Sequence, residues 1–189
     1  QETSFAQVAA DFMEIDVGLV KIIVGDTDIV KSGGGSHSGR SMRQAGTVIY
    51  LGCQDLVDKG RKIAALLFKV DPDEVEMLNG VFNVKTIGWF ELAEAAKSLD
   101  LPDALSSGLE VTRENEMDVA VFPNGCAACE VEVDPDTGVV TVERYVAVDD
   151  VGRVINPLIV DGQTHGSIAT GLGQALFEQC VIDPDSGQP

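Results

Sequence analysis

The feature that most constrains the fold is a stripe of apolar and small residues that extends from residue 42 to residue 67. Its members recur at steps of three and four: Met42, Ala45, Ile49, Cys53, Leu56, Gly60, Ile63 and Leu67. This spacing places them on one side of an α-helix, so it predicts one long amphipathic helix with a buried stripe. Gly46, Gly52 and Gly60 each cost such a helix about 1 kcal/mol relative to alanine. We therefore expect close packing against another backbone at these glycines.

Three further segments have helical signals. Phe5, Val8, Ala9 and Phe12 recur at helical spacing, with Thr3 or Ser4 as the expected N-cap. Residues 89–98 are expected to form a short helix. Asn156 followed by Pro157 is a typical helix start, and the pattern predicts a helix from there to about residue 178.

Two hairpins and two single strands complete the expected elements. Asn79-Gly80 lies between two short apolar runs, and the Val-rich residues 127–134 and 139–148 flank the turn sequence Pro135-Asp136-Thr137-Gly138. Residues 19–24 and 109–112 are expected to be single strands. The sequence thus predicts an α+β fold in which long amphipathic helices pack on mainly antiparallel β-hairpins. It forms one domain over residues 1–189, with a division into lobes 1–70 and 71–189 as an alternative.

The charge balance excludes some classes of function. The net charge is −18, from 13 Lys and Arg against 31 Asp and Glu, which argues against nucleic-acid binding. No apolar run approaches the roughly 18 residues of a membrane helix. With no secretory signal and four scattered cysteines, we expect a cytoplasmic protein. The polar start without Met and the final turn sequence at residues 183–187 lead us to expect a piece of a longer polypeptide.

A loop rich in Gly and Ser precedes the long helix. Its glycines allow the backbone N–H groups to approach a ligand, and its side chains add donors: Ser36, Ser38, Arg40 and Ser41. The positive end of the helix dipole follows directly. These properties suit a phosphate or pyrophosphate, although neither the P-loop nor the dinucleotide fingerprint is present. A surface loop without a ligand is the alternative.

Several blocks of sequence resemble the molybdenum-binding subunit of the xanthine dehydrogenase/aldehyde oxidase/carbon monoxide dehydrogenase family. They are Gly25-Asp26-Thr27, the run from Gly33 to Ser41, residues 131–134, Tyr145 to Pro157, Asp161 to Gly166, and Gly171 to Leu176. Their order and separation also match, so the resemblance covers essentially the whole chain. The sequence departs from the family pattern near Cys126, where relatives commonly have a histidine.

The resemblance implies a molybdopterin-binding domain of the aldehyde oxidase type, from the C-terminal part of a large subunit. The cofactor contacts would come from Gly35, Ser36, His37, Ser38, Gly39, Arg40 and Ser41, with Gln163 from the last helix and Gln1 from a pterin-contact loop. The cofactor would be molybdopterin, in the cytosine dinucleotide form that is usual in bacteria, with molybdenum held by its dithiolene. No residue of this chain would ligate the metal or act as the catalytic base, which the family has further downstream.

The implied enzyme is an oxidoreductase that hydroxylates aldehydes, purines or other N-heterocycles, or oxidises carbon monoxide. Its partners would be the remainder of the large subunit and iron–sulfur and FAD subunits or domains. The isolated chain is expected to be inactive. A non-catalytic nucleotide- or anion-binding module and a structural interaction domain are the alternative functions.

Four smaller motifs have structural interpretations. Cys126 and Cys129 are three apart in an expected strand and so face opposite sides, which disfavours a shared metal or disulfide. His165 is expected to be a packed, hydrogen-bonded histidine. Either Asp149 or Asp150 is expected to order the turn at Gly152, and the pair Gly162 and Gly166 to allow close helix packing.

Overall fold

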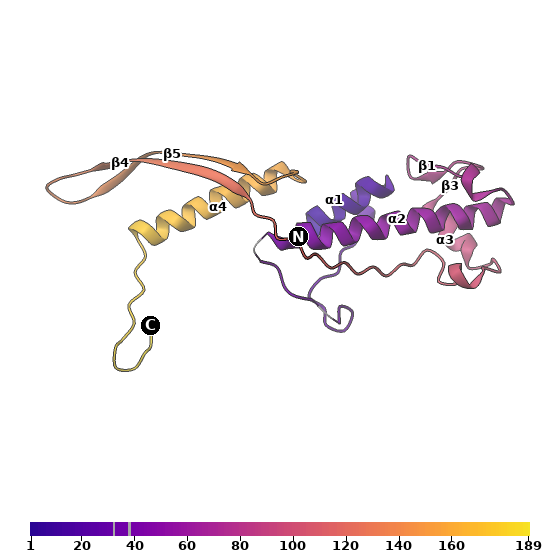
Figure 1. Cartoon of the computed structure of the whole chain (residues 1–189), viewed down its shortest axis with the longest axis horizontal. Helices are drawn as coiled ribbons and strands as arrows, with labels where there is room; N and C mark the ends of the chain where they lie inside the picture. The colour runs from indigo at the N-terminus through magenta and orange to yellow at the C-terminus, as the bar shows by residue number, and fades with distance from the viewer. Residues whose placement is uncertain (32, 38) are drawn as a thin grey trace. The chain divides into compact units, whose positions relative to one another are not determined.

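The chain folds into two units, Gln1–Ala120 and Val121–Pro189. The computed structural model describes residues 1–31, 33–37 and 39–189. Figure 1 labels the helices and strands of both units. The contacts divide the chain after Ala120, whereas the alternative division by sequence lies at residue 70. Residues on both sides of position 70 belong to the core of the first unit, which explains the difference.

Two helices that lie side by side form the body of the first unit (Figure 1). They are α1 (Glu2–Met13) and α2 (Arg40–Phe68), so the expected long helix is confirmed. Phe12 packs edge-on against Tyr50, with ring centroids 5.1 Å apart. The expected N-cap of α1 at Thr3 or Ser4 is wrong, because Gln1 occupies that position and Ser4 is buried within the helix.

A small sheet and α3 (Trp89–Ala96) cover the C-terminal half of α2. The sheet has the order β1 (Met77–Leu78), β2 (Val81–Phe82) and β3 (Ile87–Gly88), with antiparallel pairing throughout. Asn79 and Gly80 join β1 to β2 with φ values of 52° and 72°, the left-handed pair that a tight hairpin requires. The core cluster beneath these elements consists of Val57, Ile63, Ala64, Ala65, Val75, Phe82, Trp89, Leu92, Ala96 and Leu105.

The three glycines of α2 differ in their surroundings, and at Gly46 an added Cβ would lie 2.7 Å from the Met42 sulfur of the same helix. Gly60 is buried, and a Cβ at this position would collide with the Phe82 ring, lying 2.8 Å from Cε1. Phe82 has no exposed surface. At Gly52 the nearest atom would be a methyl of Val111 at 3.8 Å, which is ordinary contact. Close packing is therefore confirmed at Gly60, although the neighbour is an aromatic side chain and not a backbone.

Neither expected single strand is present in the structure. Leu19 is the last residue of the 3₁₀ helix η1 (Val17–Leu19), and residues 20–24 follow it as irregular chain. Residues 109–112 follow η3 (Asp103–Leu105) in the same way. A strand needs a hydrogen-bonded neighbour, and among the described residues neither segment has one. A further 3₁₀ helix, η2 (Pro72–Glu74), follows α2.

The second unit consists of one long hairpin and one helix. Its elements are β4 (Asn124–Val133), β5 (Val140–Asp150) and α4 (Pro157–Leu176), as the sequence predicts. The Asn156 Oδ1 accepts a hydrogen bond from the Ile159 N–H at 3.1 Å and caps α4. No residue of this unit is buried, so the buried core among the described residues lies in the first unit.

Two turns of nearly the same sequence, at residues 134–138 and 183–187, have the same hydrogen bonding. Asp134 Oδ1 accepts from the backbone N–H groups of Asp136 at 2.8 Å and Thr137 at 3.0 Å. Asp183 Oδ1 accepts from those of Asp185 at 3.0 Å and Ser186 at 2.8 Å. These backbone donors stabilise the ionised carboxylate, so they lower the pKa of Asp134 and of Asp183.

We expect both turns to lose their hydrogen-bonded structure only at acidic pH, where Asp134 and Asp183 become protonated. A carboxylate whose pKa is lower in the folded state contributes stability above its unfolded pKa, and this contribution disappears as the pH falls through the folded pKa. A carboxyl-carbon NMR titration should therefore give pKa values below 3.8 for both residues. The Asp134→Ala variant should lose order at the β4–β5 turn at neutral pH, whereas Asp134→Asn retains an acceptor. A titration midpoint at or above 3.8 for either residue would contradict this account.

Candidate functional site

The Gly/Ser loop is exposed and leads into the N-terminus of α2. Gly35 and Gly39 have φ values of 71° and 69°, a left-handed conformation that favours glycine. Gly39 is the N-cap of α2 and supplies no side-chain cap. Among the described residues, the first turn of α2 contains no acidic side chain either. The Arg40 N–H donates to the His37 carbonyl at 3.1 Å, whereas Gly39 gives the next N–H groups of this helix end no side-chain cap. Those groups can therefore bind an anion.

The polar side chains of the loop contact one another. Arg40 Nη1 lies 3.2 Å from His37 Nε2, and the hydroxyls of Ser36 and Ser41 are hydrogen-bonded. A Cβ at Gly34 would collide with the Arg40 guanidinium, so that group lies against the Gly34 backbone. The structure thus gathers five of the loop's polar and glycine positions at the start of α2.

The local charge is opposite in sign to that of the whole chain. The net charge is −18, yet residues 29–54 contain no Asp or Glu, while Lys31, Arg40 and Arg43 lie within them. The positive end of the α2 dipole has the same sign as these side chains. Such an arrangement can hold a phosphate or a diphosphate through backbone donors, hydroxyls and one guanidinium.

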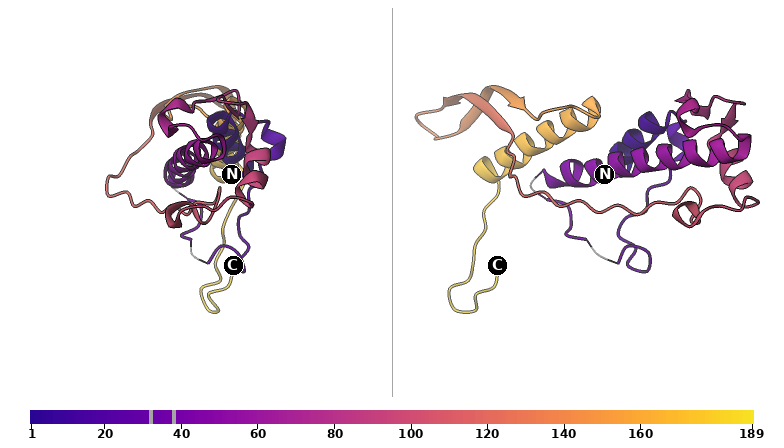
Figure 2. Two further views of the ribbon diagram at one scale, coloured as in Figure 1. Left: turned by 90° about the vertical axis from the view of Figure 1, so that its right-hand side faces the viewer. Right: turned by 45° about the vertical axis from the view of Figure 1, so that its right-hand side comes forward.

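The remaining predicted contact residues lie elsewhere or outside the described structure. Gln1 is exposed at the N-cap of α1, and two views place the N-terminus beside the N-terminal half of α2 (Figure 1; Figure 2, right). Gln163 is exposed on α4, in the second unit. Its contact with the cofactor therefore stays a prediction from the resemblance. Ser38 lies outside the described residues.

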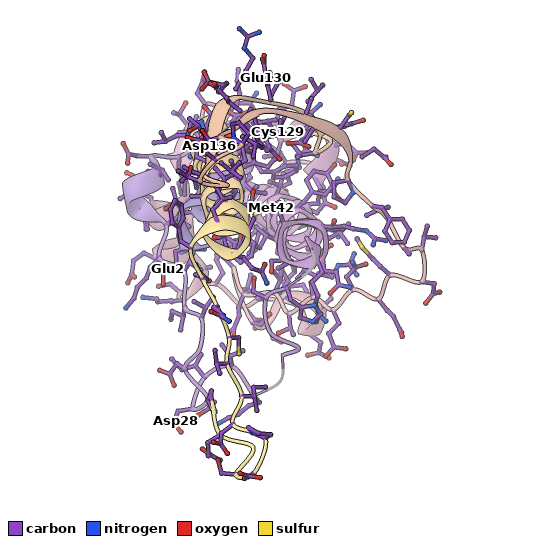
Figure 3. All side chains as sticks on the ribbon, turned by 90° about the vertical axis from the view of Figure 1, so that its left-hand side faces the viewer. Glu2, Asp28, Met42, Cys129, Glu130 and Asp136 are labelled. Atoms are coloured by element: carbon purple, nitrogen blue, oxygen red, sulfur yellow. The ribbon has the colours of Figure 1, made fainter. Side chains whose placement is uncertain are left out.

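A groove of about 470 Å³ lies between the hairpin and α4. Its strand residues alternate along the chain and include Ala127, Cys129, Tyr145 and Asp149. Cys126 is not among them and pairs with Val148 of β5, which confirms that the two cysteines face opposite sides. In Figure 3, Glu130, the neighbour of Cys129, extends from the outer side of the hairpin. Both thiols are free and exposed, whereas Cys53 is buried and burial raises the pKa of its thiol.

Three other motifs have a clear outcome. The Gly152 N–H donates to Asp150 Oδ1 at 2.9 Å, so one aspartate of the pair does order this turn. His165 is exposed, and the interpretation as a packed histidine is wrong for this structure. A Cβ at Gly162 or Gly166 would meet no atom within 4 Å, so the expected close helix packing is also wrong among the described residues.

Comparison with known proteins gives consistent matches over the whole chain. The family model of the molybdopterin cofactor-binding domain matches residues 1–189. The chain is 33% identical to the 6-hydroxypseudooxynicotine dehydrogenase complex subunit gamma of Paenarthrobacter nicotinovorans, over 100% of the chain and 24% of that protein. Two solved structures have a similar fold.

The first is a Cu,Mo-CO dehydrogenase in its carbon monoxide reduced state, with a TM-score of 0.84 and 30% identity over 96% of this chain and 23% of that one. The second is quinoline 2-oxidoreductase from Pseudomonas putida 86, with a TM-score of 0.82 and 31% identity over 99% of this chain and 24% of that one. The mixed α+β fold with antiparallel hairpins is thereby confirmed. The chain spans about a quarter of the length of these relatives. Within the described residues, no helix has the length and apolar character needed to cross a membrane.

Proposed function

The chain belongs to the family of molybdopterin cofactor-binding domains, and we propose that its local task is to hold the diphosphate of the cofactor in the loop of residues 33–41. The observation that supports this most strongly is the loop itself. It combines two left-handed glycines, a helix N-terminus without a side-chain cap, and an acid-free stretch of chain. Phosphate groups bind well where backbone donors and a helix dipole converge.

Each residue of the proposed site has a definite role. The backbone N–H groups of Gly35, Ser36, His37 and Gly39 donate to phosphate oxygens, the hydroxyls of Ser36 and Ser41 add donors, and Arg40 adds a charge-assisted one. Ser38 also contacts the diphosphate, Gln163 reaches the cofactor from the last helix, and Gln1 contacts the pterin, as the family resemblance implies. The cofactor takes the cytosine dinucleotide form.

In the whole enzyme, the cofactor supplies the molybdenum centre at which oxygen from water is transferred to a substrate. The enzyme either hydroxylates an aldehyde, a purine or another N-heterocycle, or it oxidises carbon monoxide. Iron–sulfur and FAD subunits or domains accept the electrons, in the cytoplasm.

The remainder of the large subunit also covers the second unit. In support, large apolar side chains there are exposed, among them Val148 at 71%, Leu158 at 80% and Phe177 at 84%. Large apolar side chains that are exposed in such number in one small unit are typical of a surface that a partner covers.

The 189-residue chain alone should show no turnover and retain little molybdenum. A cofactor site that binds tightly encloses most of its ligand, and an exposed loop contacts only one side. The test is to purify the chain, measure molybdenum and nucleotide, and assay aldehyde, purine and carbon monoxide oxidation with an artificial acceptor. Turnover at the rate of the intact large subunit would overturn the proposal. Tightly bound nucleotide without molybdenum would favour the non-catalytic module instead.

A further inference from the structure

Residues 107–119, which we call the strap, run back along α2 without forming a helix or strand (Figures 1 and 2). Three sets of polar contacts hold the strap on the helix: Lys59 with Ser107 and Glu110, Asp55 with Arg113, and Arg43 with Val119. Their order along α2 is the reverse of their order along the strap. The strap therefore lies antiparallel to the helix and ends at its first turns.

The two ends of the strap are fixed in different ways. At its start, Leu105 is 7% exposed within the core and Leu109 packs against the same cluster. Lys59 Nζ donates to Ser107 Oγ at 2.5 Å and to the Glu110 carbonyl at 2.6 Å. At its far end, the Arg43 guanidinium donates to the Val119 carbonyl, across 76 positions of sequence.

We propose that Arg43 is a positioning residue that joins the strap to the first turns of α2 and so steadies the helix end into which the Gly/Ser loop leads. Arg43 lies three residues after Arg40, in the acid-free stretch, yet its guanidinium bonds a backbone carbonyl. Arg43 therefore acts on the Gly/Ser loop indirectly, by holding the strap against the first turns of α2. Helix ends fray unless tertiary contacts hold them, and the strap provides such a contact from a core-anchored segment. The effect on cofactor loading rests on the proposed function, whereas the strap contact does not.

The experiment has two readouts. In the 189-residue chain, ¹⁵N relaxation should give order parameters near 0.8 for residues 110–119, and Arg43→Ala should lower those of residues 114–119 below about 0.6. Arg43→Lys, which retains a donor, should restore much of the order. Lys97→Ala removes the same charge from an exposed ion pair at the C-terminal end of α3 and should leave the order of the strap unchanged. In the full-length subunit, Arg43→Ala should lower molybdenum content to roughly half or less, since groups that hold contact residues in place change affinity by about tenfold or more.

The outcomes separate the two claims. A strap that is already mobile in the wild-type chain, or one that Arg43→Ala leaves ordered, would overturn the proposal directly. A strap that is released without loss of molybdenum would show that Arg43 does not serve the site. If Gly39→Val in the same series also kept its molybdenum, the proposed function would be at fault, whatever the strap does.

Discussion

Replacing Gly60 by alanine should lower the free energy of unfolding by about 2 kcal/mol, although alanine is the better helix former. Helix propensity alone would add about 1 kcal/mol of stability. The new methyl group, however, would collide with the ring of Phe82, and forcing extra carbon into a filled core costs about 1–3 kcal/mol or more.

Phe82 cannot move away easily. It has no exposed surface and packs edge-on against Trp89, with ring centroids 4.9 Å apart. The Trp89 indole N–H in turn donates to the Met13 carbonyl at 3.1 Å, which ties this ring to the end of α1. The collision therefore has to be relieved by shifting α2 or the β1–β2 hairpin.

Chemical denaturation of four variants tests this prediction: Gly60→Ala, Gly52→Ala, Phe82→Leu, and Gly60→Ala combined with Phe82→Leu. Gly52→Ala is the matched control, because its nearest neighbour would be a methyl at 3.8 Å, and it should be stabilising by up to about 1 kcal/mol. Combining Gly60→Ala with Phe82→Leu should cost at least about 1 kcal/mol less than the sum of the two single changes. If Gly60→Ala matched Gly52→Ala, the packing of Phe82 on α2 would be wrong.

Replacing Gly39 or Gly35 by valine should remove most of the molybdenum from the full-length subunit while leaving it folded. Among the described atoms, a Cβ at either position meets nothing within 4 Å, so an added side chain would intrude only on space available to a ligand. Both residues also have left-handed backbones, where a side chain costs about 1–2 kcal/mol. We expect the ratio of molybdenum to protein to fall by about tenfold or more, since several phosphate contacts are lost together.

Gly138→Val is the control for the backbone effect. Gly138 has a φ of 74° and equally open surroundings, but it lies in the β4–β5 turn. The control should keep its full content of molybdenum and of cytidine nucleotide. Metal analysis measures the first, and the nucleotide released by acid hydrolysis measures the second. Full cofactor loading in the Gly39→Val variant would contradict the assignment of the loop.

The elements with local signals could be predicted from the sequence. The apolar period of α2, the Asn79-Gly80 turn and the Asn156-Pro157 helix start each depend on a few neighbouring residues. The loop was also recognisable, because its glycines and hydroxyls lie directly before a helix. These features act within one or two turns of chain, so their spacing is enough to identify them.

What depends on distant partners could not be predicted in the same way. Residues 19–24 have β-forming side chains, but a strand also requires a neighbour, and the sequence does not reveal whether one exists. Whether His165 and the face of α4 around Gly162 are exposed depends on what packs against α4. The residues of α4 alone do not determine this. The bond between Arg43 and Val119 joins an unremarkable arginine to a backbone carbonyl, and no local pattern marks it.

The most direct test is an experimental structure of the full-length subunit with its cofactor bound. Our account predicts that the cofactor's phosphate oxygens lie about 2.7–3.2 Å from backbone nitrogens of the loop between Gly35 and Gly39, at the N-terminus of α2, with the Arg40 guanidinium on the same group. Phosphates that lie elsewhere, with this loop making no contact to the cofactor, would contradict it.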